Sequence, residues 1–125
     1  MTIEELLVAR LTGYPALAAL VGNRVYPLVL PQNVALPAMT YQRISTLRVR
    51  SHSGPSGLAH PRFQFACWAD SYAEAANVTR VLRLALDGFK LTPGGAALSE
   101  NEIDDYEAET GRWRINADYI IWHSE

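Results

Sequence analysis

The sequence predicts a single α+β domain over residues 1–125, an antiparallel sheet with its helices packed mainly on one face. The chain has 125 residues, of which 49% are hydrophobic, so it is long enough for one core and short for two domains. Helix-like and strand-like segments occur in clusters, without the strict alternation of a parallel fold. The one cysteine, Cys67, excludes an intrachain disulfide and a zinc site built on several sulfur ligands.

The first half of the chain predicts two helices followed by strands. Thr2 and Glu5 have the spacing of a capping box, and apolar residues then recur on one helical face. Pro15 suits the first turn of a short second helix, PALAALV, which a glycine closes. The run RVYPLVL is extended, and its Pro27 indicates a sheet edge or a bulge. AMTYQRIS and RFQFACWA both predict strands.

The second half predicts one long helix and a closing hairpin. The helix SYAEAANVTRVLRLALDG begins with a second capping box, Ser71 and Glu74, and carries an apolar stripe. An acidic extended run, ALSENEIDDYEAE, follows the turn TPGG. The dipeptide TG then turns the chain into a last strand, whose alternation places Trp113 and Ile121 on one face. The expected order is α-α-β-β-β-α-β-β.

The charges are divided between the two halves of the chain, although the net charge is only -2. Residues 1–69 hold six arginines against Glu4 and Glu5, for a net charge of +4. Residues 70–125 hold eleven acids against five bases, for a net charge of -6. Opposite charges can therefore meet within the fold or between copies of the chain.

Few residues are candidates for catalysis or for metal binding. His52, His60 and His123 have no helical pair spacing, and we expect loop or surface roles for them. Cys67 shares a strand face with two phenylalanines, which favours a buried structural thiol over a nucleophile. Six carboxylates between Glu100 and Glu109 lack the register of a calcium loop, which favours a solvated hairpin or a protein interface. We therefore expect no catalytic residue, no metal and no cofactor.

Nothing in the sequence suggests membrane insertion or export. No run of about 18 consecutive apolar residues occurs. The N-terminal stretch MTIEELLVAR is acidic where a signal peptide would be basic. We expect a soluble protein made inside the cell, with no membrane partner.

Three long stretches of the sequence resemble one protein family. They are LAALVGNRVYPLVLPQNVALPAMTYQRIS, RFQFACWADSYAEAANVTRVLRLALDG and DDYEAETGRWRINADYIIWHSE, and they run almost from end to end of the chain. In these stretches the sequence resembles the tail completion, or tail terminator, proteins of long-tailed bacteriophages and related gene transfer agents. The most specific elements are the segment from RVYPL to YQRIS, the ADSYAEA junction, the ALDG helix end and the closing GRWRINADYIIWHSE. None of them is a catalytic motif.

The resemblance implies a structural virion protein and no enzymatic activity. Its members would form a ring, a hexamer, that caps the finished tail tube and offers a surface to the head connector. The implied partners are further copies of the chain, the tail tube protein and a head connector or adaptor, with DNA passing through the bore without specific binding. The implied place is the head–tail junction of the virion, after assembly in the host cytoplasm.

A ring needs one patch that meets a different patch on the next copy, and the uneven charges provide two such patches. Residues 46–60 contain no acid and surround a Gly-Pro-Ser-Gly centre, so we expect a mobile loop that acts as a docking arm. The acids near residue 105 are expected to form the opposing patch. The expected interface residues are Arg48, Arg50, His52, Arg62, Asp104, Asp105 and Glu107.

Two other interpretations of residues 46–60 stay open. The segment can be an ordinary solvated hairpin loop, since loops of this length are functional or disordered. It can also belong to a small nucleic-acid-binding module, in which the arginines straddle phosphates. The acidic C-terminal half and a pI of about 5.9 argue against that module, because binding to a phosphate backbone depends on accumulated positive charge.

Overall fold

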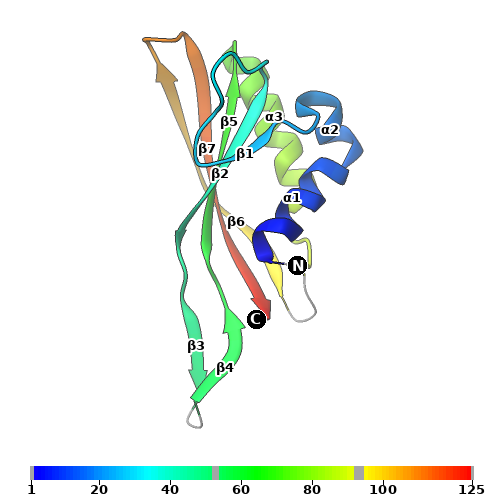
Figure 1. Cartoon of the computed structure of the whole chain (residues 1–125), viewed down its shortest axis with the longest axis vertical. Coiled ribbons are helices and arrows are strands. Elements are labelled where there is room, and N and C mark those ends of the chain that lie inside the picture. Colours follow the sequence, from blue (N-terminus) through cyan, green and yellow to red (C-terminus); the bar gives the residue numbers. More distant parts are fainter. Residues whose placement is uncertain (1, 52–53, 92–94, 125) are drawn as a thin grey trace.

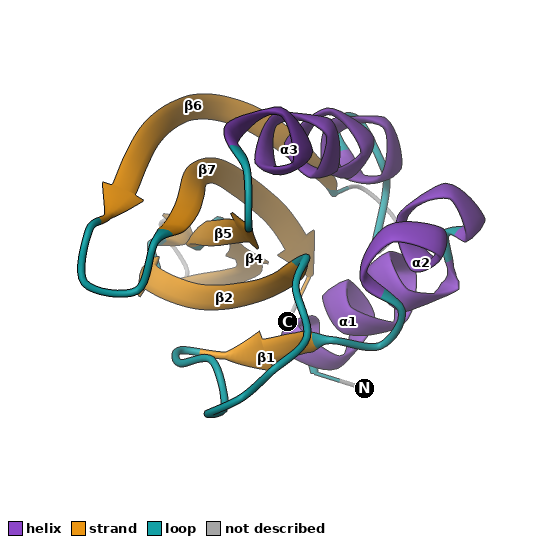
Figure 2. Cartoon of the chain, turned by 90° about the horizontal axis from the view of Figure 1, so that it is seen from above, coloured by secondary structure: helices purple, strands orange, loops and turns teal. Residues whose placement is uncertain are grey.

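Seven strands form one curled sheet, and three helices gather on one side of it (Figure 1, Figure 2). The computed structural model describes residues 2–51, 54–91 and 95–124. The α+β class that the sequence predicts is confirmed. In chain order the elements are α1 (Ile3–Gly13), α2 (Pro15–Val21), β1 (Val25–Pro27), β2 (Ala38–Ser45), β3 (Arg48–Ser51), β4 (Gly54–Ala59), β5 (Arg62–Ala69), α3 (Tyr72–Leu86), β6 (Ala96–Glu107) and β7 (Arg112–Ser124).

Local sequence signals set the helix ends as expected. Thr2 and Glu5 form a full capping box, in which each side chain accepts a hydrogen bond from the other residue's backbone N–H at 3.2 Å. Gly22 ends α2 with a φ of 60°, a conformation that costs glycine little. The Ser71 hydroxyl accepts from the Glu74 N–H at 3.2 Å and begins α3. The reciprocal bond to the Glu74 side chain is absent from the described structure, so only half of the expected second capping box forms. Among the described residues, no helix is long and apolar enough to cross a membrane.

The central strand of the sheet is β7. It pairs with β5 and β4 along one side and with β6 along the other. Beyond β5 the order continues through β2 to β1, so β1 is an edge strand, as Pro27 indicates. All pairs are antiparallel except β1 with β2, which is parallel. The two long edges of the sheet therefore differ: one is made by β1 and β2, and the other by β6.

The segment that the sequence presents as a loop contains two further strands. β3 and β4 pair antiparallel, with Arg48 opposite Ala59 and Arg50 opposite Pro55. Together they form a ribbon that projects beyond the helices at one end of the molecule (Figure 1). Ala59 also pairs with His123 at the end of β7, a partner too distant in the sequence for a local pattern to reveal. The observed order is thus α-α-β-β-β-β-β-α-β-β, two strands more than expected. The mobility of the arm stays a prediction.

The core lies between the helices and the inner face of the sheet. Alternate residues of β5 and β7 point into it, so the predicted alternation of both strands is confirmed. The stripe on α3 and the apolar faces of α1 and α2 close it from the other side. The largest fully buried side chains are Tyr119, Phe63, Phe65, Leu7, Leu11, Leu17, Met39, Leu82, Leu86, Ile121, Val21 and Val78.

Candidate assembly interface

The arm carries two of the expected interface arginines. Arg48 and Arg50 belong to β3, and both side chains are exposed. Because β3 and β4 extend past the helices, these cations stand away from the body of the domain (Figure 1). His52 lies outside the described residues. The arm therefore presents positive charge at one end of the molecule.

Arg62 belongs to the body of the domain, and its charge is compensated there. Its guanidinium lies 2.7 Å from Glu100 Oε1 and 3.6 Å from Asp118 Oδ2. These contacts join β5 to β6 and β7 on the face of the sheet away from the helices. The nearness of Arg62 to the arm in the sequence does not make it part of the projecting ribbon.

The three expected acidic residues lie together in the last third of β6, and each has a partner in the same chain. The Tyr72 hydroxyl donates to Asp104 Oδ2 at 2.7 Å, which raises the pKa of Tyr72. Arg114 pairs with Asp105 and holds the pKa of that carboxyl below its usual value. The Thr110 hydroxyl donates to Glu107 Oε1 at 2.6 Å. The acids thus help to fix β6 and its turn, whatever else they contact.

Three of the six carboxylates between Glu100 and Glu109 are neutralised by arginines of the same chain. Glu100 pairs with Arg62, Asp105 with Arg114, and Glu102 with Arg83 at 2.5 Å. Among the described residues, no arginine or lysine pairs with Asp104, Glu107 or Glu109. Residual negative charge therefore collects at the turn between β6 and β7.

The positive arm and this acidic turn lie at opposite ends of the molecule (Figure 1). Asp105 pairs with Arg114 and Leu58 pairs with Ser124, positions that are ten residues apart on β7. At strand rise this separation is roughly 33 Å, several times the screening length of about 8 Å at physiological salt. Within one subunit the two patches do not interact, so each is available to a different partner.

A third feature was not predicted from the sequence: apolar residues are exposed at the edges of the sheet. Leu28 and Val29 follow β1 and are 66% and 73% exposed, and Leu28 has a φ of 64°. Ile103, on β6, is 53% exposed. A signal was present in the run RVYPLVLP, which holds more apolar residues than a three-residue edge strand can bury. Exposed apolar groups at two edges are typical of interaction surfaces.

The side chains considered as candidates for catalysis are buried or packed against other side chains. Cys67 is fully buried in the core, and burial raises its pKa to about 12, so the thiol stays neutral at ordinary pH. The His60 ring stacks on Trp122 with 4.2 Å between ring centroids. His123 is buried on β7, with Nδ1 3.2 Å from the Ser124 carbonyl oxygen, so the loop or surface role expected for it is wrong. In the described ranges, no cluster of three or more histidine, cysteine, aspartate or glutamate side chains could hold a metal ion.

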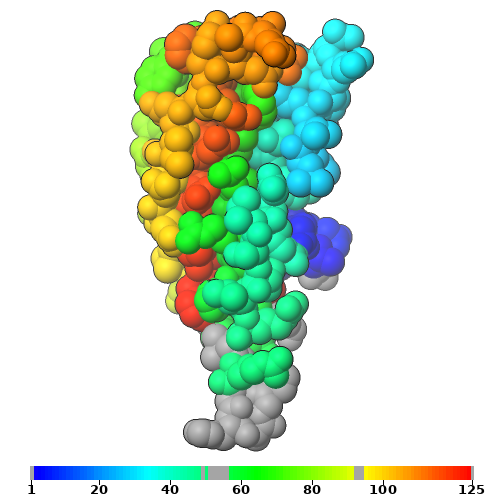
Figure 3. Space-filling model, turned by 90° about the vertical axis from the view of Figure 1, so that its left-hand side faces the viewer, coloured from blue at the N-terminus to red at the C-terminus, as the bar shows by residue number. Residues whose placement is uncertain are grey.

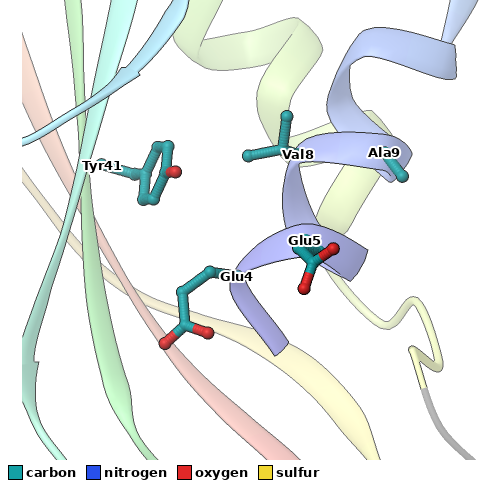
Figure 4. A pocket seen from close by; sticks show the side chains of 5 residues that line it. All are labelled: Glu4, Glu5, Val8, Ala9 and Tyr41. Carbon is teal, nitrogen blue, oxygen red and sulfur yellow. The ribbon is translucent and has the colours of Figure 1, made fainter. Parts of the chain in front are cut away.

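A cleft of about 430 Å³ lies between α1 and β2 (Figure 4). Glu4, Glu5, Val8 and Ala9 line it from α1, and Tyr41 faces them from β2. Both carboxylates are engaged in the fold, because Glu4 pairs with Arg43 and Glu5 forms the capping box with Thr2. The Thr2 hydrogen bonds lower the pKa of Glu5, which keeps it ionised in that role.

Comparison with known proteins identifies the fold and the family of the chain. None of the curated proteins compared with the chain matches it. A solved structure, "Virion of native gene transfer agent (GTA) particle", contains a chain of the same fold, with a TM-score of 0.83 and 19% sequence identity over 98% of this chain and 95% of that one. The family model for tail completion protein gp17 matches residues 5–124. The chain therefore belongs to the tail completion protein family, the structural proteins of phage tails.

Proposed function

We propose that this chain forms a ring, a hexamer, that caps the tail tube and joins the tail to the head of a long-tailed phage or a phage-like particle. The observation that carries the proposal is the match of the family model to residues 5–124, nearly the whole chain. The likeness of the fold to a chain from a gene transfer agent virion agrees with it. In this role the protein acts at the head–tail junction, after assembly in the host cytoplasm.

The two ends of the molecule differ in charge, which suits a subunit that must contact two different neighbours along the particle. The arm offers exposed arginines at one end, and the turn between β6 and β7 offers carboxylates at the other. Contacts at the ends of a ring subunit can reach the tail tube on one side and the head connector or adaptor on the other. Charge complementarity at such contacts speeds association and rejects wrong partners.

A nucleic-acid-binding module is the alternative, and the placement of the arginines argues against it. Arg43, Arg62, Arg83 and Arg114 all pair with carboxylates of the same chain. Each such pair removes a cation that phosphate binding would require. In the ring, DNA passes through the bore without specific binding, and carboxylates that line the bore reduce sticking by repulsion.

Two measurements test the proposal. Native mass spectrometry of the purified protein, with and without the tail tube protein, should show a closed ring and its binding to tubes. Particles produced without this chain should appear in electron micrographs as separate heads and as tails of irregular length. Complete virions formed without the chain would contradict the proposed function. Tight, salt-sensitive DNA binding that is lost together with Arg48 and Arg50 would favour the nucleic-acid alternative.

A further inference from the structure

The exposed apolar residues of this chain fall into two groups that follow opposite edges of the sheet. In the described part of the chain, nine large hydrophobic side chains are exposed. The first group lies beside β1, at the end of β2 and at the start of the arm, and consists of Leu28, Val29, Ile44 and Leu47. The second lies on β6 and on α3, which contacts β6 through Tyr72 and Arg83, and consists of Tyr72, Leu84, Leu98, Ile103 and Tyr106. We call these two surfaces the β1–β3 edge and the β6 edge.

The β6 edge also presents unpaired backbone. β6 has 12 residues, and the only strand that pairs with it in the described ranges is β7. On its other side, Ala97 already bonds the backbone of Gly88 and Phe89, and the Ser99 N–H bonds Asp87 Oδ1. The N–H and C=O groups that β6 offers to an incoming strand or loop therefore lie beyond Ser99. Ile103 lies opposite Asn116 and Leu98 opposite Ile120, so both project from the face of the sheet away from the helices. Figure 3 looks onto that face and shows β6, in yellow and orange, along one side of it.

The β1–β3 edge runs along the other side of the same face (Figure 3). Here β1 is only three residues long, and Pro27 has no N–H to donate. The apolar pair Leu28–Val29 follows directly, with the Leu28 N–H bonded to the Tyr41 carbonyl oxygen at 2.9 Å. This backbone bond fixes the position at which the two exposed side chains leave the edge.

The charges of the two edges are of opposite sign. Arg48 and Arg50 lie on β3, and Arg43, which pairs with Glu4, lies on β2. Five carboxylates lie along β6, and of these Asp104 and Glu107 pair with no arginine or lysine of the described residues. Each edge therefore combines apolar anchors with charges that complement those of the other edge. A surface with both properties fits the opposite edge of another copy better than it fits itself, because like charges would meet in a symmetric contact.

We propose that the β6 edge of one copy docks against the β1–β3 edge of the next copy, with Ile103 and Val29 as its apolar anchors. This inference rests on the proposed ring and assigns the contact between its subunits. The contact is heterologous, so an open assembly of any length still has one free edge of each kind, one at each end. Repetition with a fixed rotation closes a ring.

Two variants test the contact by blocking one edge each. Val29→Glu places a carboxylate on the β1–β3 edge, and Ile103→Glu places one on the β6 edge. Both side chains are exposed in the single chain, so folding should be unaffected. In the contact each new carboxylate would be desolvated without a cation, and self-association should weaken at least about 100-fold. Ala19→Glu, at an exposed position on α2, is the matched control and should assemble like the wild type.

Mixing the two variants gives the sharper result. Each variant alone should be monomeric by native mass spectrometry at concentrations where the wild type forms multimers. The equimolar mixture should contain dimers with one copy of each variant, because the β6 edge of Val29→Glu and the β1–β3 edge of Ile103→Glu are intact. No assembly larger than this dimer should form, since its two remaining edges both carry a blocking substitution.

Three results would overturn this inference: a wild type that stays monomeric up to about 1 mM, variants that assemble like the wild type, or a mixture without dimers. Failure of the proposed function gives a different result. Complete virions that form without the chain would contradict the proposed function. If the two variants still behave as described, the contact between subunits is supported all the same.

Discussion

Gly95 lies directly against the backbone carbonyl of Trp122, and no space for a side chain remains between them. This close approach brings the start of β6 onto the end of β7, where Ala96 pairs with Trp122. A Cβ atom at position 95 would overlap the carbonyl oxygen, and a backbone atom cannot move aside as a flexible side chain can.

Gly95→Ala should therefore lower the free energy of unfolding by about 1–3 kcal/mol, the usual cost of overpacking. Urea denaturation of the variant and the wild type measures this change in the free energy of unfolding. The matched control is Gly13→Ala at the end of α1, where a Cβ meets nothing within 4 Å. There the loss of chain entropy in the unfolded state should stabilise the protein by about 0.4–1 kcal/mol. Equal stability of the two variants would show that β6 and β7 tolerate a wider spacing.

Cys67→Ala should keep the fold and the assembly of particles, at a cost of about 1 kcal/mol for a small core truncation. In the folded wild type a thiol reagent at pH 8 should leave Cys67 unlabelled, because the thiol is buried and neutral. Loss of particle maturation in a normally folded Cys67→Ala protein would contradict a structural role for this residue.

The stability difference between the wild type and Cys67→Ala should shrink as the pH rises. Burial raises the pKa of Cys67 from 9.0 to about 12, so the unfolded thiol ionises before the folded one does. The stabilisation is complete below pH 9 and is lost as the pH rises toward 12. The difference should fall by about 1 kcal/mol between pH 8 and pH 10, as measured by urea denaturation of both proteins. A difference that does not change with pH would contradict the raised pKa.

Reversing Asp104, Asp105 and Glu107 to lysine should weaken self-association or binding to tail tubes. Raised salt should weaken the wild type in the same direction, because these groups are exposed or half-buried. Since each carboxylate also has a partner in its own chain, thermal denaturation must first show that the variant is folded. The neutral set Asp104→Asn, Asp105→Asn and Glu107→Gln should give an intermediate result. Salt-independent assembly that neither set affects would remove this patch from the interface.

Replacing residues 48–57 by a short Gly-containing turn should leave the melting temperature nearly unchanged but prevent tails from joining heads. Arg48, Arg50 and Gly57 are exposed, and the cost of loop closure varies slowly with loop length. The replacement must stop before Leu58, because Ala59 is fully buried and pairs with His123. Electron microscopy of particles tests the arm, and virions of normal form would support an ordinary loop. DNA affinity should be weak before and after the replacement.

The sequence predicts those parts of this fold that depend on short spacings. Thr2 with Glu5 marks a helix start within one turn, and the alternation around Phe63 and Phe65 marks a strand. The strands of the arm could not be found in this way. Their pairing is fixed partly by Ala59 against His123, residues that are far apart in the chain.

The candidate site could be predicted only in part, for a similar reason. The surplus of arginine in one half and of acid in the other can be counted in the sequence, but the partners cannot. Arg62 meets Glu100 across 38 residues of chain, and Arg83 meets Glu102 across 19. The exposed apolar residues at the edges could not be predicted, because Leu28 and Ile103 resemble core residues in the sequence. Only the strand order shows that they lie at the edges of the sheet.

The central place of β7 has a consequence for how the protein is made. It is the last of the seven strands in chain order, yet β4, β5 and β6 all pair with it. On the ribosome, β2 and β5 can pair as soon as they emerge, but the other edge of β5 has no strand to pair with until β7 leaves the exit tunnel. Sheets built on such long-range pairings form slowly and expose strand edges meanwhile. A nascent chain stalled before residue 112 should therefore bind chaperones, whereas the released chain should not.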